Sequence, residues 1–440
     1  MNAPEKKTLG YWEVTAIGIG GMVGGGIFAV LGLSVELSGG GAPVAFLIAG
    51  IVALVTSYSY AKLSVAFPSQ GGTVAFLDRA FGPGLLTGTA NILLWISYMV
   101  MLSVYAYAFG SYGASFFPPA TQPLWKHILI TGVVVGITGL NLLNTRLIGK
   151  AEDWIVLLKL VILAFFIGVG IWGIDSARLT PSTWSPPLHL IAGGMIIFLA
   201  YEGFELIANT AQDVRNAPKT LPRAFYSSVG FVIVIYVLVA IVTVGTLPID
   251  AIVGAKDYAL AEAAKPSLGQ LGFILIAIAA MLSTASAINA TVYGAARLSY
   301  VIAKDGELPQ ILEKKTWGKP VDGLLITSGV TLLIANLTNI SSMSTMGSAG
   351  FLLIFAAVNA ANVILAKETG SLRTLSIIGV VLCLSALGSL VWETGSSTPG
   401  QLWFLFAMLG TAFLIEITFR TVTGRSMNLS QQKQKIDSDS

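Results

Sequence analysis

The chain has 440 residues, of which 55% are hydrophobic and only 11% are charged, and its formal net charge is +3. An ordinary soluble domain is about 25% charged, so the composition excludes that class and indicates a membrane protein. So small a net charge gives no support to nucleic-acid binding. The single cysteine, Cys383, excludes an intramolecular disulfide.

Apolar stretches long enough to cross a bilayer recur along the whole chain. A transmembrane helix needs about 20 apolar residues, and we count such stretches centred near residues 24, 54, 99, 135, 162, 201, 235, 283, 331, 356, 382 and 411. These twelve spans predict an all-α polytopic membrane protein. The first apolar run is too long for a signal-peptide core and no clear cleavage site follows it, so we expect a retained N-terminal tail.

The basic residues indicate how these spans are oriented. An even number of spans puts both termini on one side of the membrane, and twenty of the 25 Lys and Arg residues fall on that side. Four fall in the opposite segments: Lys126, Arg178, Lys256 and Lys265. Because cationic loops are retained in the cytoplasm, we expect both termini to be cytoplasmic and the protein to lie in the cytoplasmic membrane.

One basic residue, Lys159, falls inside a span. It lies about nine residues beyond Lys150, and at 1.5 Å per residue that is roughly 14 Å, near the middle of the bilayer. Lys159 could be a structural cation paired with a glutamate. Burial favours the neutral form of a lysine, so we favour a residue that gains and loses a proton and thereby couples proton movement to conformation.

The first span contains six glycines in the stretch GIGGMVGGGIF, residues 18–28. Small residues let transmembrane helices approach closely, which is one explanation. The alternative is an unwound segment whose free N–H groups, at the positive end of the next half-helix, hold a substrate carboxylate. The candidates for that role are Gly24, Gly25, Gly26 and Ile27.

The sixth span carries two carboxylates near its middle, Glu202 and Glu205, in the stretch GGMIIFLAYEGFELIANTAQDV. A charged side chain at this depth is costly, so neither is expected to face lipid. They could cap the amides of a broken helix. Alternatively, the released carbonyls of Leu199, Ala200 and Tyr201 bind a substrate ammonium while one glutamate handles a proton or positions the pocket.

Other polar side chains at membrane depth are weaker candidates. Ser283, Thr284 and Ser286 in the eighth span offer hydroxyls, although such residues often serve helix packing. Tyr98, in the middle of the third span, is the aromatic residue we expect as a pocket wall. His127 and His189 are isolated from each other, so no metal site is indicated, and no phosphate-binding loop indicates ATP-driven pumping.

Interrupted spans at corresponding positions of two halves indicate an inverted-repeat transporter with its site near mid-membrane. We therefore expect two five-span repeats, residues 11–178 and 179–368, followed by two further spans in residues 369–422. Cytoplasmic tails at residues 1–10 and 423–440 complete the predicted organisation. No nucleophile and base, cofactor motif or paired histidines indicate an enzyme.

Four segments resemble the amino acid, polyamine and organocation (APC) permease family. The first span, MVGGGIFAVLG, is similar to the unwound glycine motif of that family. The segments FPSQGGTVAFLDRAFG (67–82), FLAYEGFELIANTAQDVRNAPKTLPRA (198–224) and AKDGELP (303–309) resemble its other signatures. Within the family, the likeness is greatest to the proton-coupled, sodium-independent amino acid transporters of the ApcT type.

The resemblance implies a LeuT-like fold, a five-plus-five inverted repeat with helices one and six discontinuous, and it assigns roles to single residues. The substrate carboxylate would be held at Met22, Gly25 and Gly26, and the ammonium at Leu199, Ala200 and Glu202. Glu202 departs from the characterised relatives, where an apolar side chain is common at this position. Its carboxylate could favour cationic substrates or only cap the break.

The resemblance also places a fifth-helix lysine where sodium sits in sodium-coupled relatives. The positions that correspond are Lys159, Gly20, Val23, Ser283 and Ser286. The sequence therefore predicts a secondary active amino acid transporter that works by alternating access, with a proton in place of sodium and no cofactor. An obligate exchanger of amino acids or amines, or a membrane sensor that binds an amino acid without moving it, are the alternatives.

Overall fold

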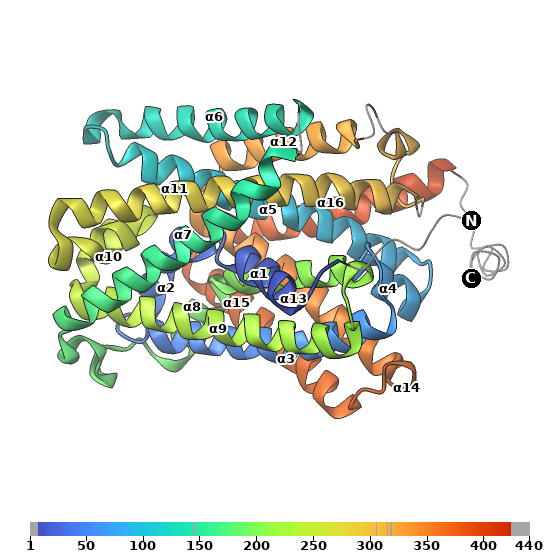
Figure 1. The fold of residues 1–440 in the computed structure, drawn as a ribbon, viewed down its shortest axis with the longest axis horizontal. Coiled ribbons are helices and arrows are strands. Elements are labelled where there is room, and N and C mark those ends of the chain that lie inside the picture. The colour runs from blue at the N-terminus through green and yellow to red at the C-terminus, as the bar shows by residue number, and fades with distance from the viewer. Residues whose placement is uncertain (1–7, 144–145, 305, 315, 317–318, 424–440) are drawn as a thin grey trace.

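The computed structural model describes residues 8–143, 146–304, 306–314, 316 and 319–423. Residues 1–7 and 424–440, which make up most of the two predicted tails, lie outside these ranges. The long helices run in alternating directions along the long axis of the molecule (Figure 1). We call the right-hand side of Figure 1, where α4 lies, the α4 end, and the opposite side the α10 end.

The helices follow one another in chain order with short connections. Their bounds are α1 Tyr11–Met22, α2 Gly26–Ser38, α3 Ala42–Ala66, α4 Thr73–Phe81, α5 Leu85–Ala114, α6 Gln122–Leu143, α7 Arg146–Gly170, α8 Pro187–Ile196, α9 Ala217–Thr246, α10 Ile249–Gly254, α11 Ala259–Lys304, α12 Val321–Leu337, α13 Ile340–Ile364, α14 Ala366–Thr369, α15 Arg373–Ser397 and α16 Gly400–Thr423. The 3₁₀ segments are η1 Pro119–Thr121, η2 Ile171–Gly173, η3 Ser176–Leu179, η4 Pro181–Thr183, η5 Phe198–Asp213, η6 Lys256–Tyr258 and η7 Gln310–Glu313.

The described residues contain nine helical segments long and apolar enough to cross a membrane, and eleven when two bent pairs are each counted as one span. A further apolar helix, α12, has 17 residues. Eleven of the twelve predicted centres fall within a helical element, and the first, residue 24, falls at the bend between α1 and α2. The predicted all-helical, polytopic membrane fold is therefore confirmed.

Both predicted discontinuous spans are bent. The helices α1 and α2 meet at 46° across Val23, Gly24 and Gly25, and α8 meets η5 at 44° across Ile197. The sequence placed the second break at Leu199, and in the structure it begins two residues earlier, at Ile197. Beyond the break the backbone continues as a 3₁₀ helix, a form that often marks a hinge when it interrupts a span.

The four half-helices pack in pairs through glycine. A Cβ atom on Gly203 of η5 would lie 2.6 Å from the carbonyl oxygen of Gly21 and 2.5 Å from the nitrogen of Met22, so α1 and η5 touch backbone to backbone. In the other pair, Gly193 of α8 packs directly against Ser38 of α2. The close-packing explanation of the glycines therefore holds for Gly21, whose own Cβ would lie 2.7 Å from the oxygen of Gly203.

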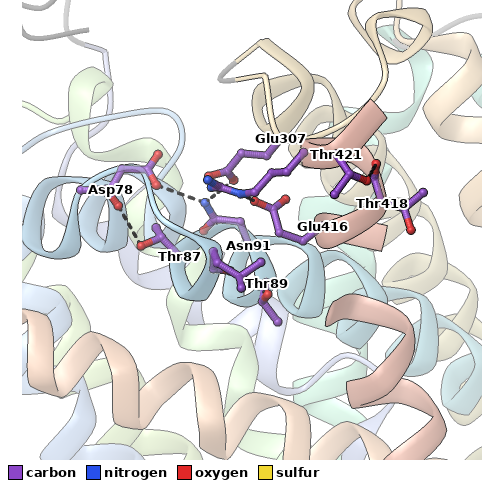
Figure 2. Close-up of polar contacts among 11 residues, drawn as sticks. Asp78, Thr87, Thr89, Asn91, Glu307, Glu416, Thr418 and Thr421 are labelled. Carbon is purple, nitrogen blue, oxygen red and sulfur yellow. Dashed lines mark hydrogen bonds and ion pairs between the residues drawn. The ribbon is translucent and has the colours of Figure 1, made fainter. Parts of the chain in front are cut away.

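At the α4 end, two of the quoted sequence motifs meet on one asparagine. The Asn91 amide of α5 donates to Asp78 Oδ1 at 3.1 Å and to Glu307 Oε2 at 2.7 Å (Figure 2). Asp78 belongs to the 67–82 motif and Glu307 to the 303–309 motif. Glu416 of α16 lies beside them and accepts a hydrogen bond from Arg420.

We expect Gly203→Ala to destabilise the protein, because the added methyl meets backbone atoms of Gly21 and Met22 that cannot rotate away. Overpacking of this kind costs about 1–3 kcal/mol, and thermal unfolding in detergent measures it. The matched control is Gly230→Ala in α9, where no atom lies within 4 Å of the new Cβ. Equal unfolding temperatures for the two variants would refute the backbone contact.

Candidate functional site

Side chains from intact helices take up the carbonyls that the first break releases. Lys159 Nζ of α7 donates to the carbonyl of Gly20 at 3.1 Å, and the ammonium-bearing side chain is only 2% exposed. Ser283 of α11 donates its hydroxyl to the carbonyls of Val23, at 3.1 Å, and Gly24. These polar groups come from α7 and from the part of α11 beyond its kink at Gly269, so the break is satisfied inside the protein and not by lipid.

A tyrosine of α9 joins the two breaks. The Tyr236 hydroxyl lies 2.6 Å from the carbonyl oxygen of Met22 and 3.2 Å from that of Ala200, so it can donate to either. Its ring packs against Tyr201 with centroids 5.1 Å apart. Tyr201 itself turns away from the breaks and donates to the carbonyl of Phe46 on α3 at 3.0 Å.

Unlike the carbonyls, the N–H groups at the first break lack hydrogen-bond partners in the described structure. Within the described ranges, the backbone N–H groups of Gly24, Gly25, Gly26 and Ile27 have no hydrogen-bond acceptor. The first intrahelical bond beyond the break runs from Ala29 to the carbonyl of Gly25. These unbonded donors stand at the N-terminus of α2, where the helix dipole is positive. The arrangement suits an anion.

The second break is closed by one serine of α13. Ser348 donates its hydroxyl to the carbonyl of Ile196 at 3.1 Å and accepts the N–H of Leu199, also at 3.1 Å. The carbonyl of Ile197 accepts the N–H of Ala200 at 2.9 Å. Where α8 ends, the carbonyl of Ile196 and the N–H of Leu199 lose their main-chain partners, and the Ser348 hydroxyl replaces them. This replacement allows the helix to break at Ile197.

The two glutamates of the sixth span have different surroundings. Glu205 accepts hydroxyl hydrogen bonds from Tyr60 and Thr73, each at 3.0 Å, and from Tyr98. Glu202 is 3% exposed, and its Oε2 has no partner among the described residues. The first carboxylate is thus held by the protein, while the second keeps an acceptor for another group.

Close neighbours cover the glycines of the first break. A Cβ on Gly25 would meet the Tyr105 ring, and one on Gly26 would lie 2.7 Å from Cα of Ala200. A Cβ on Gly24 would lie 3.0 Å from that of Ala287. Only glycine fits in this segment at such separations.

The structure brings together part of the predicted constellation. Lys159 contacts Gly20, and Ser283 contacts Val23, residues that the resemblance grouped together; Ser283 also contacts Gly24, which was not in that group. Ser286 is placed differently: it makes no hydrogen bond within the part of the chain that the structure describes.

Other predicted residues point to partners that the sequence did not suggest. The Tyr98 hydroxyl is directed at Glu205 and its ring packs against Phe351, so Tyr98 lies beside the held carboxylate. Thr284 donates back to the carbonyl of Ala280 in its own helix at 2.7 Å. These contacts are not directed at the first break.

Sequence reasoning missed four polar residues at the breaks and at Glu205. They are Tyr60, Thr73, Tyr236 and Ser348. Of these, Thr73 lies in a quoted motif and could have been singled out there. The others stand in apolar spans like many other hydroxyl residues, and nothing in the sequence marks the direction of their side chains.

A cavity of about 430 Å³ opens at the α10 end. Its lining includes Leu33 from α2, Tyr107 from α5, Ile196 at the end of α8 and the acidic residues Asp257 and Glu393. Since Ile196 directly precedes the second break, the cavity reaches that break. Several of its charges are paired, among them Lys256 with Glu36 and His189 with Glu393.

Comparison with known proteins gives the fold a family. Residues 9–414 match the sequence profile of the amino acid permease family. The chain is 37% identical to the uncharacterized protein MJ0609 of Methanocaldococcus jannaschii, with 96% of this chain and 98% of that protein covered.

Several relatives carry transporter names, among them proteins of Escherichia coli and Bacillus subtilis. The inner membrane transport protein YbaT of Escherichia coli is 30% identical, with 95% of this chain and 97% of that protein covered. The branched-chain amino acid permease BcaP of Bacillus subtilis is 24% identical, with 88% and 89% covered. The chain therefore belongs to the amino acid permease family, and it is a membrane transporter and not an enzyme.

Proposed function

We propose that the protein is a secondary active transporter of amino acids that works by alternating access and is driven by protons, without sodium. The amino acid permease family supports the substrate class. The name of the relative BcaP, a branched-chain amino acid permease, is in keeping with it. The narrower likeness to transporters of the ApcT type is part of the proposal.

The proposal rests on a difference between the two kinds of main-chain group at the first break: the carbonyls have hydrogen-bond donors, and the N–H groups have no acceptors among the described residues. Its carbonyls are taken by Lys159, Tyr236 and Ser283, whereas the N–H groups of Gly24 to Ile27 stay unbonded in the described structure. Leaving buried N–H donors unpaired costs about 1–3 kcal/mol each. A substrate carboxylate at the α2 N-terminus removes that cost, so we assign it to Met22, Gly24, Gly25, Gly26 and Ile27.

The second break supplies the opposite charge. We place the substrate ammonium against the carbonyls of Leu199 and Ala200 and the free Oε2 of Glu202. Because Tyr236 contacts the carbonyls of both Met22 and Ala200, it holds the two halves of this site at a fixed separation. A zwitterion matches a site with donors on one side and acceptors on the other.

We assign the coupling ion to Lys159. A buried ammonium beside the carbonyl of Gly20 gives the first broken helix a positive partner, and loss of its proton removes that charge. Proton binding at Lys159 would thus stabilise one position of α1 and proton release another. Glu205, with three hydroxyl donors, supports η5 in this scheme.

The cavity and the charges suggest which state and orientation the structure represents. We place the α4 end in the cytoplasm because Lys62, Arg79 and Arg297 belong to segments at that end. The cavity at the α10 end then faces outward. At the α4 end, the start of α1 is joined to the end of η5 by a bridge between Leu9 and Val214, which closes the inward path.

The division into two inverted repeats, residues 11–178 and 179–368, is part of the same proposal. An obligate exchanger would use the same site, and preloading of vesicles separates the two modes: an exchanger stays silent without internal substrate. A sensor would bind an amino acid and move none. Uptake of labelled amino acids into proteoliposomes, with and without an inward proton gradient and with sodium varied, tests the proposal directly.

We expect Lys159→Ala to remove the dependence of uptake on external pH and to lower proton-driven uptake by roughly 5- to 150-fold, the range of typical coupling free energies. Lys159→Arg keeps the charge but cannot release a proton, so it should bind substrate and lose pH dependence. The control is Lys219→Ala, an exposed lysine of α9. Intact pH-dependent uptake by Lys159→Ala would refute the coupling role.

We expect Glu202→Gln to weaken binding of cationic amino acids by roughly 10- to 100-fold relative to neutral ones, because a hydrogen bond to a charged group contributes about 1.5–3 kcal/mol. Competition of a labelled neutral amino acid by lysine, arginine and diamines measures the ratio. Glu416→Gln is the control, since Glu416 is also buried with an unpaired Oε2 but lies at the α4 end. An unchanged ratio in Glu202→Gln would exclude Glu202 from the pocket.

A further inference from the structure

The half-helix α8 is attached to the neighbouring helices at both of its ends. Near its start, His189 Nδ1 lies 3.0 Å from Glu393 Oε2 of α15. At its last residue, the carbonyl of Ile196 accepts a hydrogen bond from Ser348 of α13. His189 is 44% exposed, and a pair so open to solvent contributes little stability. The contact with Ser348 is buried and so constrains α8 more strongly.

Ser348 is the joint between α8, η5 and α13. Its hydroxyl bonds residues on both sides of Ile197: the carbonyl of Ile196 before the break and the N–H of Leu199 after it. Ser348 is fully buried, so water does not replace these bonds if they are lost. A rotation of α8 relative to η5 must therefore turn about this serine or break one of its two bonds.

The residue of α8 that Ser348 holds, Ile196, forms part of the cavity wall. Ile196 lines the cavity at the α10 end, together with Asn339, Ile340 and Ser341 around the start of α13. Across the cavity, α2 contributes Leu33 and is packed on α8 through Gly193. Separation of α8 from α13 would carry α2 with it and widen the cavity.

We propose that Ser348 is a positioning residue that holds the end of α8 against α13, and so fixes both the place of the second helix break and the width of the cavity. Ser348 acts on transport through Leu199 and Ala200 and does not itself touch substrate. The inference deepens the proposed transport cycle and rests on it for the role of the movement.

The test uses a thiol introduced by Leu33→Cys, because Leu33 lines the cavity and is 2% exposed. The native Cys383 is fully buried and gives the background rate. In this background, Ser348→Ala should raise the rate of labelling by a membrane-impermeant maleimide roughly tenfold, since the buried hydrogen bonds that tie the end of α8 and the start of η5 to α13 are both lost.

Ser344→Ala is the matched control. Ser344 lies one turn earlier on α13, is equally buried, and its hydroxyl has no partner among the described residues. It should label at the unmodified rate. Equal labelling rates for Ser348→Ala and Ser344→Ala would overturn the proposal. Ser348→Thr keeps the hydroxyl, so a folded Ser348→Thr protein that labels several-fold faster than the parent would also overturn it.

A second measurement separates this inference from the proposed function. Ser348→Ala should weaken the apparent affinity for the transported amino acid several-fold, with no change in Ser344→Ala, if the serine positions Leu199. Absence of amino acid uptake in the parent protein would refute the proposed function. The labelling comparison needs no substrate, so it still decides whether Ser348 holds α8.

Discussion

The structure depends on the satisfaction of main-chain groups where two transmembrane helices are interrupted. Lipid offers no hydrogen bonds, so each carbonyl and N–H released inside the bilayer needs a partner from the protein or from a ligand. Here Lys159, Ser283, Tyr236 and Ser348 bond main-chain groups at the breaks, and all four come from helices other than the two broken spans. In the described residues these side chains leave the N–H groups of Gly24 to Ile27 without a hydrogen-bond partner, and the proposed substrate site rests on that.

Glycine lets the interrupted helices remain packed in spite of their bends. Gly21 and Gly203 allow main-chain contact between α1 and η5, and Gly193 brings α8 onto α2. Each contact joins a half of the first broken span to a half of the second. Because a packed interface is either formed or not formed, such pairs are suited to rigid-body movement between discrete positions.

The sequence predicted the spans and the place of the first break because both follow from composition. Six glycines in eleven residues and a lysine at mid-membrane depth are unusual in any apolar span, so they stand out without a structure. The depth of Lys159 followed from counting residues, and its contact with Gly20 from the family resemblance. These predictions rest on local pattern, which one sequence contains in full.

The remaining site residues could not be predicted because their roles depend on side-chain direction. Tyr236 and Tyr226 occupy the same helix and look alike in sequence, yet the first is fully buried at the breaks and the second is 38% exposed. Ser344 and Ser348 are one turn apart and equally buried, and one of them closes the second break. Such differences arise only when α9 and α13 are packed against the broken spans.

The motifs at the α4 end show the same dependence on tertiary packing at a second place. Asn91 has two amide hydrogens, and both are used, one on Asp78 and one on Glu307. These carboxylates lie more than 200 residues apart in the chain, so their common donor could not be inferred from either motif. Both hydrogens of the amide are thus used. The Asn91 side chain links α4 to the segment that follows α11.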